Sequence, residues 1–122
     1  MLDHVTLGVT DLARSLAFYD RALAAIGIDR LYAEGDAYAG YGAGTKAFFW
    51  IGRKDAVTTG AHIAFAVPDH AAVDRFHAVA LAAGGRDNGA PGPRPHYHPN
   101  YYGAFVLDPD GHNIEAVCHA AE

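Results

Sequence analysis

The stretch LDHVTLGVTD at residues 2–11 returns as GAHIAFAVPD at residues 60–69. In both copies a histidine precedes apolar residues at every second position, and an aspartate ends the stretch. Alternation with a period of two predicts a β-strand, and an aspartate after it is a good N-cap for a helix. Each copy therefore predicts a strand followed directly by a helix, with His4 and His62 at the two strand starts.

The similarity between the two halves extends beyond these strands. A shift of 58 residues also aligns positions in the segments that follow, namely Phe18 with Phe76, Ala22 with Ala80, Leu23 with Leu81 and Gly27 with Gly85. Two copies at so long a period are too few for a solenoid. They indicate an old duplication of a half-domain.

Further elements are predicted from periodicity and turn residues. The first helix presents one apolar face, made of Leu12, Leu16, Tyr19, Leu23 and Ile26. Short strands are expected after the helices, near residues 30–33, 38–41, 47–51, 101–107 and 113–118. The turn DPDG at residues 108–111 joins the last two. The Gly- and Pro-rich stretch at residues 86–100 is interpreted as a long loop, and such loops often carry function.

Size and composition limit the classes of function. A chain of 122 residues, about half of them apolar, predicts one globular domain over residues 1–122. The formal charge of −5 and the lack of a basic run argue against nucleic acid or an anionic membrane as partner. Cys118 is the single cysteine, which excludes an internal disulfide and a zinc site made of cysteines. The first residues resemble no export signal, so we expect a cytoplasmic protein.

The faces of the predicted strands suggest a metal site. Beside His4 and His62, the same strand faces carry only small residues, which leaves room for an ion or a ligand. In the last strand, Glu115 shares a face with Asn113, opposite the apolar face of Ile114, Ala116 and Cys118. His4, His62 and Glu115 are therefore expected to line one concave surface. Two imidazoles and a carboxylate suit a divalent cation such as Fe, Zn, Ni or Mn.

Another interpretation of Glu115 stays open at this point. A carboxylate inside the apolar run NIEAVC needs a partner, because an unpaired buried charge is costly. That partner is either a metal ion or the cation of an arginine or lysine, and periodicity does not decide between them. For each histidine alone, an ordinary hydrogen-bonded surface role is the more frequent one.

Three segments together resemble a known family. LDHVTLGVTDLARSLAFYDRAL, HIAFAV and YYGAFVLDPDGHNIEAV resemble the vicinal oxygen chelate superfamily, which includes glyoxalase I, bleomycin-resistance proteins, fosfomycin thiol transferases and extradiol dioxygenases. The resemblance implies an α+β fold of two tandem βαβββ modules, at residues 1–55 and 60–119. Their curved mixed sheets would form an open barrel with the helices outside.

The resemblance also implies positions for the metal ligands. Family ligands on the first and last strands of each module correspond to His4, His62 and Glu115. The fourth position falls on Phe49 or Trp50, in a segment, residues 46–53, that contains no Asp or Glu. The four-ligand pattern of glyoxalase I is therefore broken. The remaining set is similar to that of extradiol dioxygenases and fosfomycin thiol transferases, although the arginine and lysine typical of the latter are missing.

Acid–base residues are expected in the long loop. A ring-cleaving enzyme of this family usually has a further His or Tyr for proton transfer, and RPHYHPNYY offers several. His98 and Tyr102 are the predicted pair, because they lie nearest the strand that should border the barrel. The alternative is that the tyrosines are ordinary strand residues and that Pro95 and Pro99 only stiffen the loop.

These observations leave two functions open. The first is a metal-dependent enzyme for a small molecule with neighbouring oxygens: a ring-cleaving dioxygenase, a glyoxalase-like lyase or isomerase, or a group transferase. The second is a metal-free binding protein of the bleomycin-resistance type, and a decayed site is a third option. A homodimer is expected from the resemblance and from base rates. The ligands would then come from one chain or from two.

Overall fold

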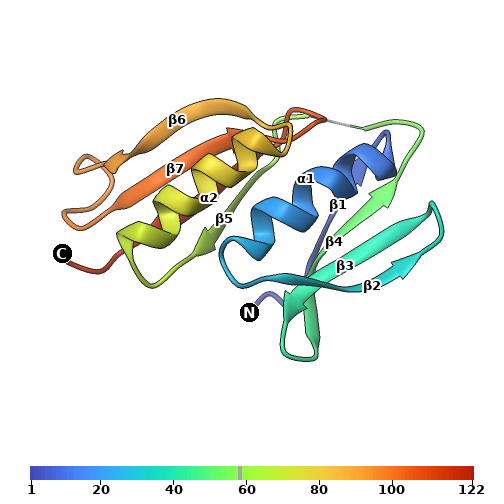
Figure 1. Cartoon of the computed structure of the whole chain (residues 1–122), viewed down its shortest axis with the longest axis horizontal. Helices are drawn as coiled ribbons and strands as arrows, with labels where there is room; N and C mark the ends of the chain where they lie inside the picture. Colours follow the sequence, from blue (N-terminus) through green and yellow to red (C-terminus); the bar gives the residue numbers. More distant parts are fainter. Residues whose placement is uncertain (58) are drawn as a thin grey trace.

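The computed structural model describes residues 1–57 and 59–122, and it contains two copies of a βαβββ module (Figure 1). The first module consists of β1 (Val5–Val9), α1 (Leu12–Ala24), β2 (Asp29–Glu34), β3 (Tyr38–Ala43) and β4 (Lys46–Arg53). The second consists of β5 (His62–Ala66), α2 (His70–Ala82), β6 (Arg86–Pro93), β7 (Tyr102–Leu107) and β8 (Asn113–Cys118). The predicted duplication is therefore confirmed in the fold.

Each module forms its own four-stranded mixed sheet. The strand orders are β1-β4-β3-β2 and β5-β8-β7-β6, so the opening strand of each module lies at a sheet edge. That strand runs parallel to the last strand of its module, and the remaining pairs are antiparallel. The two sheets do not close on each other, which confirms the expected open arrangement of an α+β fold.

The helices begin where the sequence predicts. The Asp11 carboxylate accepts a hydrogen bond from the backbone N–H of Arg14, and that of Asp69 accepts one from Ala72. Each aspartate thus satisfies a backbone donor that has no partner within the helix. Gly27 and Gly84 follow the helices with φ of 83° and 105°, values that a side chain disfavours.

One face of each sheet is covered by its helix. Figure 1 shows α1 and α2 side by side, each across its own sheet. The alternate residues predicted to face the helices are buried, among them Leu7, Val9, Phe65, Ile114 and Ala116. The other face of each sheet, called the open face below, carries His4 and Thr6 in the first module and His62 and Ala64 in the second.

The interpretation of residues 86–100 as one long loop is wrong in its first half. Arg86–Pro93 forms β6, which pairs with β7 through an irregular register. As the outermost strand of its sheet, β6 tolerates prolines that would remove ladder hydrogen bonds from a central strand. Gly89 has a φ of 153° at one irregularity. The Gly and Pro content therefore marks a bulged edge strand, and the loop is confined to residues 94–101.

The turn at residues 108–111 connects β7 and β8 of the second module, and its residues contact the first module. Asp108 is buried, and its carboxylate accepts a hydrogen bond of 2.5 Å from the hydroxyl of Tyr19 in α1. The same carboxylate accepts the backbone N–H groups of Asp110 and His112. His112 is also buried, with Nε2 3.1 Å from the Gly8 carbonyl oxygen in β1. These contacts hold the turn of the second module against the first.

Within the described residues, neither helix has the length and apolar character needed to cross a membrane.

Candidate functional site

His62 and Glu115 meet on the open face of the second sheet. In the parallel pair of β5 and β8, Ala64 lies opposite Glu115, and His62 lies two residues before Ala64. The small side chain of Ala64 leaves room for the His62 imidazole to reach across the strand boundary. His62 Nε2 then lies 2.8 Å from Glu115 Oε1. The predicted proximity of an imidazole and a carboxylate is thus present on this face.

The environment of Glu115 differs from that of His62. The Glu115 side chain is 1% exposed, whereas that of His62 is 49% exposed. The second carboxylate oxygen, Oε2, accepts a short hydrogen bond from the hydroxyl of Tyr101. Gly103 on β7 leaves space for this contact, since a Cβ there would lie 3.2 Å from Glu115 Oε2. Each carboxylate oxygen therefore has a partner, and the imidazole remains open to solvent.

Tyr101 acts as a hydrogen-bond donor in this network. Burial raises the pKa of its phenol to about 12, with further contributions from the hydrogen bond and the negative charge of Glu115. A phenol with so high a pKa stays protonated near neutral pH. Tyr101 therefore supplies a fixed O–H to Glu115 instead of competing with it as an anion.

No arginine or lysine pairs with Glu115 among the described residues. The guanidinium of Arg94 lies 5.5 Å from the centre of the Phe105 ring, and it donates to the carbonyl oxygens of Ala90 and Gly92. The alternative in which an arginine or lysine cation balances Glu115 is therefore absent from the described residues. His62 and Tyr101 are the partners that the buried carboxylate requires.

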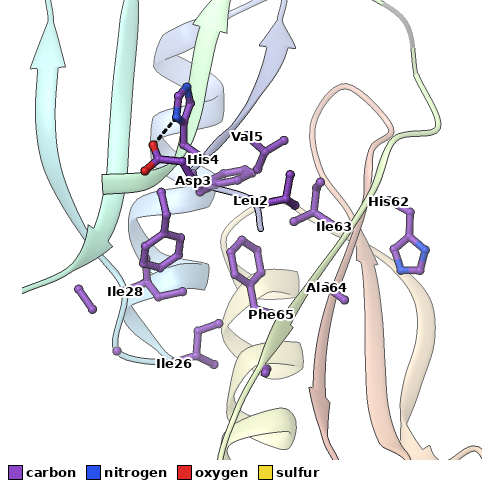
Figure 2. A pocket seen from close by; sticks show the side chains of 15 residues that line it. Leu2, Asp3, His4, Val5, Ile26, Ile28, His62, Ile63, Ala64 and Phe65 are labelled. Carbon is purple, nitrogen blue, oxygen red and sulfur yellow. Dashed lines mark hydrogen bonds and ion pairs between the residues drawn. The ribbon is translucent and has the colours of Figure 1, made fainter. Parts of the chain in front are cut away.

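His4 does not join this pair within one chain. Figure 2 shows His4 and His62 on opposite sides of a pocket, with the apolar side chains of Leu2 and Ile63 between them. His4 Nδ1 lies 2.8 Å from Asp3 Oδ2, and Lys46 also binds Asp3. The hydrogen bond from Lys46, followed by that from His4, lowers the pKa of Asp3. His4 itself is half exposed.

The position equivalent to Glu115 in the first module is Trp50. Thr6 lies opposite Trp50 in the first sheet, just as Ala64 lies opposite Glu115 in the second, and Thr6 and Ala64 correspond in the 58-residue repeat. Phe49, the other residue considered for this position, is buried in the core. An indole therefore stands where the duplicated half has its carboxylate.

His98 and Tyr102 lie apart from Glu115 in this structure. The Tyr102 hydroxyl donates to Asp74, and its ring stacks on His70 with centroids 3.8 Å apart. His98 Nδ1 accepts the backbone N–H of Asn100. The alternation of residues along β7 could have indicated that Tyr101, and not Tyr102, lies near Glu115. Tyr102 alternates with the buried Ala104 and Val106, whereas Tyr101 shares the parity of Phe105 on the open face.

A second group of metal-binding residue types lies at the start of α2. His70, Cys118 and Glu122 offer ligand atoms that all lie within 4.8 Å of one another, and within the described residues this is the one group of three or more such side chains. Cys118 is buried, and its Sγ accepts the backbone N–H of Ala120 at 3.3 Å. The sequence predicted Cys118 on the apolar face of the last strand. Its proximity to His70 and Glu122 was not anticipated.

Comparison with known proteins identifies the family. The sequence model of the Glyoxalase/Bleomycin resistance protein/Dioxygenase superfamily matches residues 1–116, so the chain belongs to this superfamily. A glyoxalase/bleomycin resistance protein from Albidiferax ferrireducens is 31% identical, with a TM-score of 0.85 over 97% of this chain and 98% of that chain. The resemblance inferred from the three sequence segments is thereby confirmed.

Two further solved structures extend the comparison. A glyoxalase I variant from Zea mays is 28% identical, with a TM-score of 0.72 over 95% of this chain and 45% of that chain. A glyoxalase-related enzyme from Fulvimarina pelagi shares the fold at 23% identity, with a TM-score of 0.75 over 97% of this chain and 87% of that chain. A search of curated proteins found no match.

Proposed function

We propose that the chain is a metal-dependent enzyme for a small molecule with neighbouring oxygens, with the metal bound by His4, His62 and Glu115. The observation that carries the proposal is the 2.8 Å approach of His62 Nε2 to Glu115 Oε1 on an open sheet face. Metal-binding groups on adjacent strands need such proximity to share one ion. Membership of the superfamily supports the same interpretation.

The donor set fits a borderline divalent ion. Imidazole nitrogen and carboxylate oxygen are ligands that Fe, Zn, Ni and Mn accept. Tyr101 orients Glu115 through its second oxygen, as outer partners of metal ligands commonly do. When bound, the ion would supply Lewis-acid polarisation of substrate oxygens. The residues of the chain hold the ion, keep the carboxylate oriented and retain the Tyr101 proton beside it.

In this proposal the site is shared between two copies of the chain. One copy supplies His62 and Glu115, and the other supplies His4. Within one chain His4 is bonded to Asp3 across the pocket from His62. The strands next to the two histidines, β1 and β5, are both sheet edges, which leaves them free to approach another copy. A twofold homodimer would place each His4 near the other copy's His62 and Glu115, and would form two identical sites.

Metal analysis tests the proposal directly. The purified protein is loaded with Zn²⁺, Ni²⁺, Mn²⁺ or Fe²⁺ in turn, and binding is measured by calorimetry and by metal content. His62→Ala and Glu115→Gln should each weaken binding by about a hundredfold or more, because even outer partners of a site are worth ten- to a hundredfold. Cys118→Ser is the matched control and should leave the affinity unchanged.

Two results would contradict the ligand assignment. Unchanged affinity in both His62→Ala and Glu115→Gln would exclude this pair as ligands. Loss of binding in Cys118→Ser alone would move the metal to the group at His70. Once binding is established, oxygen uptake with a panel of catechols and lactoylglutathione formation distinguish ring cleavage from glyoxalase chemistry.

A metal-free binding protein is the second candidate. Its support is Trp50, an aromatic side chain at the position equivalent to Glu115, where a four-ligand site would have a carboxylate. Indole rings serve small-molecule binding better than metal coordination. A protein that binds none of the four metal ions at micromolar concentration would favour this candidate over the enzyme.

A further inference from the structure

Three aromatic side chains gather on the open face of the first sheet. The ring of Trp50 stacks on that of Tyr32, with centroids 5.8 Å apart and an interplanar angle of 15°. Tyr38 lies 6.0 Å from Trp50 at 55°. Tyr32 and Tyr38 are 53% and 44% exposed, unusually open for large aromatic residues. We call Tyr32, Tyr38 and Trp50 the aromatic platform.

Glycines make room for side chains on this open face. Gly40, opposite both Tyr32 and Trp50, has no side chain, and a Cβ there would lie 2.6 Å from the Trp50 ring. Gly8 likewise makes room for the side chain of Lys54, because a Cβ at Gly8 would lie 3.0 Å from Cγ of Lys54. The aliphatic stem of Lys54 therefore crosses the open face over Gly8.

The cavity beside the platform has two basic side chains, Arg53 and Lys54, in its lining. It has a volume of about 420 Å³, and its lining includes Tyr38, Trp50 and His4 but, among the described residues, no Asp or Glu. This composition contrasts with the net charge of −5 of the whole chain. Neither Arg53 nor Lys54 forms an ion pair with another described residue. Their charges are thus free to attract an anion.

We propose that the aromatic platform and Lys54 form a binding site for a small aromatic carboxylate. The ring of the ligand packs against Trp50 and Tyr38, the two platform residues that line the cavity, and its carboxylate lies near the Lys54 ammonium. Ring stacking contributes beyond the apolar area it buries, and a partly desolvated ion pair adds charge complementarity. The cavity is also lined by His4, one of the proposed metal ligands, so this site adjoins the proposed metal site, but benzoate binding itself requires no bound ion.

The single tryptophan of the chain makes this site directly observable. Trp50 is the only tryptophan, so a change in indole fluorescence reports on the platform itself. Benzoate is the probe, and titrations contain a metal chelator. Benzamide keeps the ring without the charge, and cyclohexanecarboxylate keeps the charge without the aromatic ring. Benzoate should bind about tenfold more tightly than either analogue, which corresponds to one charge-assisted contact or one stacking contact.

Variants assign the contacts. Calorimetry should show about tenfold weaker benzoate binding for Lys54→Met and loss of measurable binding for Trp50→Leu. Lys46→Met is the control, because Lys46 is paired with Asp3 outside this cavity and its removal should have no effect. His62→Ala should also bind benzoate normally. Failure of the metal proposal and failure of this one are therefore distinguishable.

Several outcomes would overturn the inference. Equal affinity for benzoate and benzamide would remove Lys54 from the site, and no fluorescence response to any of the three compounds would exclude the site altogether. A second copy of the chain could instead cover the platform. In that case Trp50 fluorescence would change with protein concentration, and Trp50→Leu would alter the oligomeric state measured by light scattering.

Discussion

Glu115 is nearly inaccessible to solvent, yet both of its oxygens have partners. The sequence predicted that a carboxylate in an apolar strand needs a partner, because the cost of burying it alone is general. The sequence did not show which residue would be that partner. Tyr101 and Tyr102 are adjacent and chemically identical, and only the strand register decides which one faces Glu115.

A first prediction concerns the acidity of Tyr101. Glu115→Gln removes the negative charge beside the phenol, so the pKa of Tyr101 should fall from about 12 toward the ordinary value of 10. The tyrosinate absorbance as a function of pH measures this shift, and Tyr101→Phe identifies which transition belongs to Tyr101. An unchanged titration curve in Glu115→Gln would contradict the hydrogen bond between the two side chains.

The same group makes stability depend on pH in a definite direction. Its pKa in the folded chain, about 12, lies above the value of 10 of an unperturbed tyrosine. The unfolded chain therefore loses this proton first, and the stabilising contribution is full below about pH 10 and lost as the pH rises toward about 12. Tyr101→Phe should show a smaller decrease in the free energy of unfolding over this interval, measured by urea denaturation. An equal decrease in both proteins would contradict this linkage.

A further prediction concerns Gly40. In Gly40→Ala the new methyl group meets the Trp50 ring at 2.6 Å, so the ring must move. We expect a loss of about 1–3 kcal/mol in the free energy of unfolding, as for other overpacked positions, and a shift in Trp50 fluorescence. Gly52→Ala is the control, because a Cβ there has no neighbour closer than 3.9 Å. Equal effects of the two substitutions would contradict the packing of Trp50 over Gly40.

At the scale of the elements, the strand–helix order followed from local signals. Alternation in β1 and β5 and the caps at Asp11 and Asp69 depend on neighbours in sequence, so they could be predicted. The edge strand β6 could not, because its glycines and prolines are typical of loops. Only its position at the edge of a sheet, a property of the tertiary fold, makes them acceptable there.

The contact between α1 and the turn at residues 108–111 gives a prediction at this scale. Tyr19→Phe removes the donor to the buried Asp108, and should lower the free energy of unfolding by about 1–3 kcal/mol, the usual cost of an unsatisfied buried acceptor. Burial and the neighbouring carboxylate raise the pKa of Tyr19 well above its ordinary value, so the hydroxyl keeps its proton and stays a donor in alkaline solution. Tyr102→Phe, which removes an exposed hydrogen bond, should cost less than about 1 kcal/mol. Equal losses would contradict a special role for the turn.

At the scale of the whole molecule, the two modules present chemically different open faces. The second carries His62, Glu115 and Tyr101, and the first carries the aromatic platform with Lys54. Alternation along the strands predicted the face that carries His62 and Glu115, but Tyr101 and the aromatic platform were not predicted. The sequence did not predict that His4 and His62 lie across a pocket from each other, because the arrangement of the two modules depends on contacts between distant segments such as those of Asp108 and His112.

The central claim is that His4 of one copy completes a metal site with His62 and Glu115 of another. It is tested by pairing a His4→Ala chain with a His62→Ala chain, each with a different affinity tag, and measuring the metal content of the isolated heterodimer. One of its two composite sites keeps all three ligands, so the heterodimer should bind metal at half the wild-type content, while both variant homodimers bind weakly. A heterodimer with no more metal than the variant homodimers would contradict a site shared between two copies.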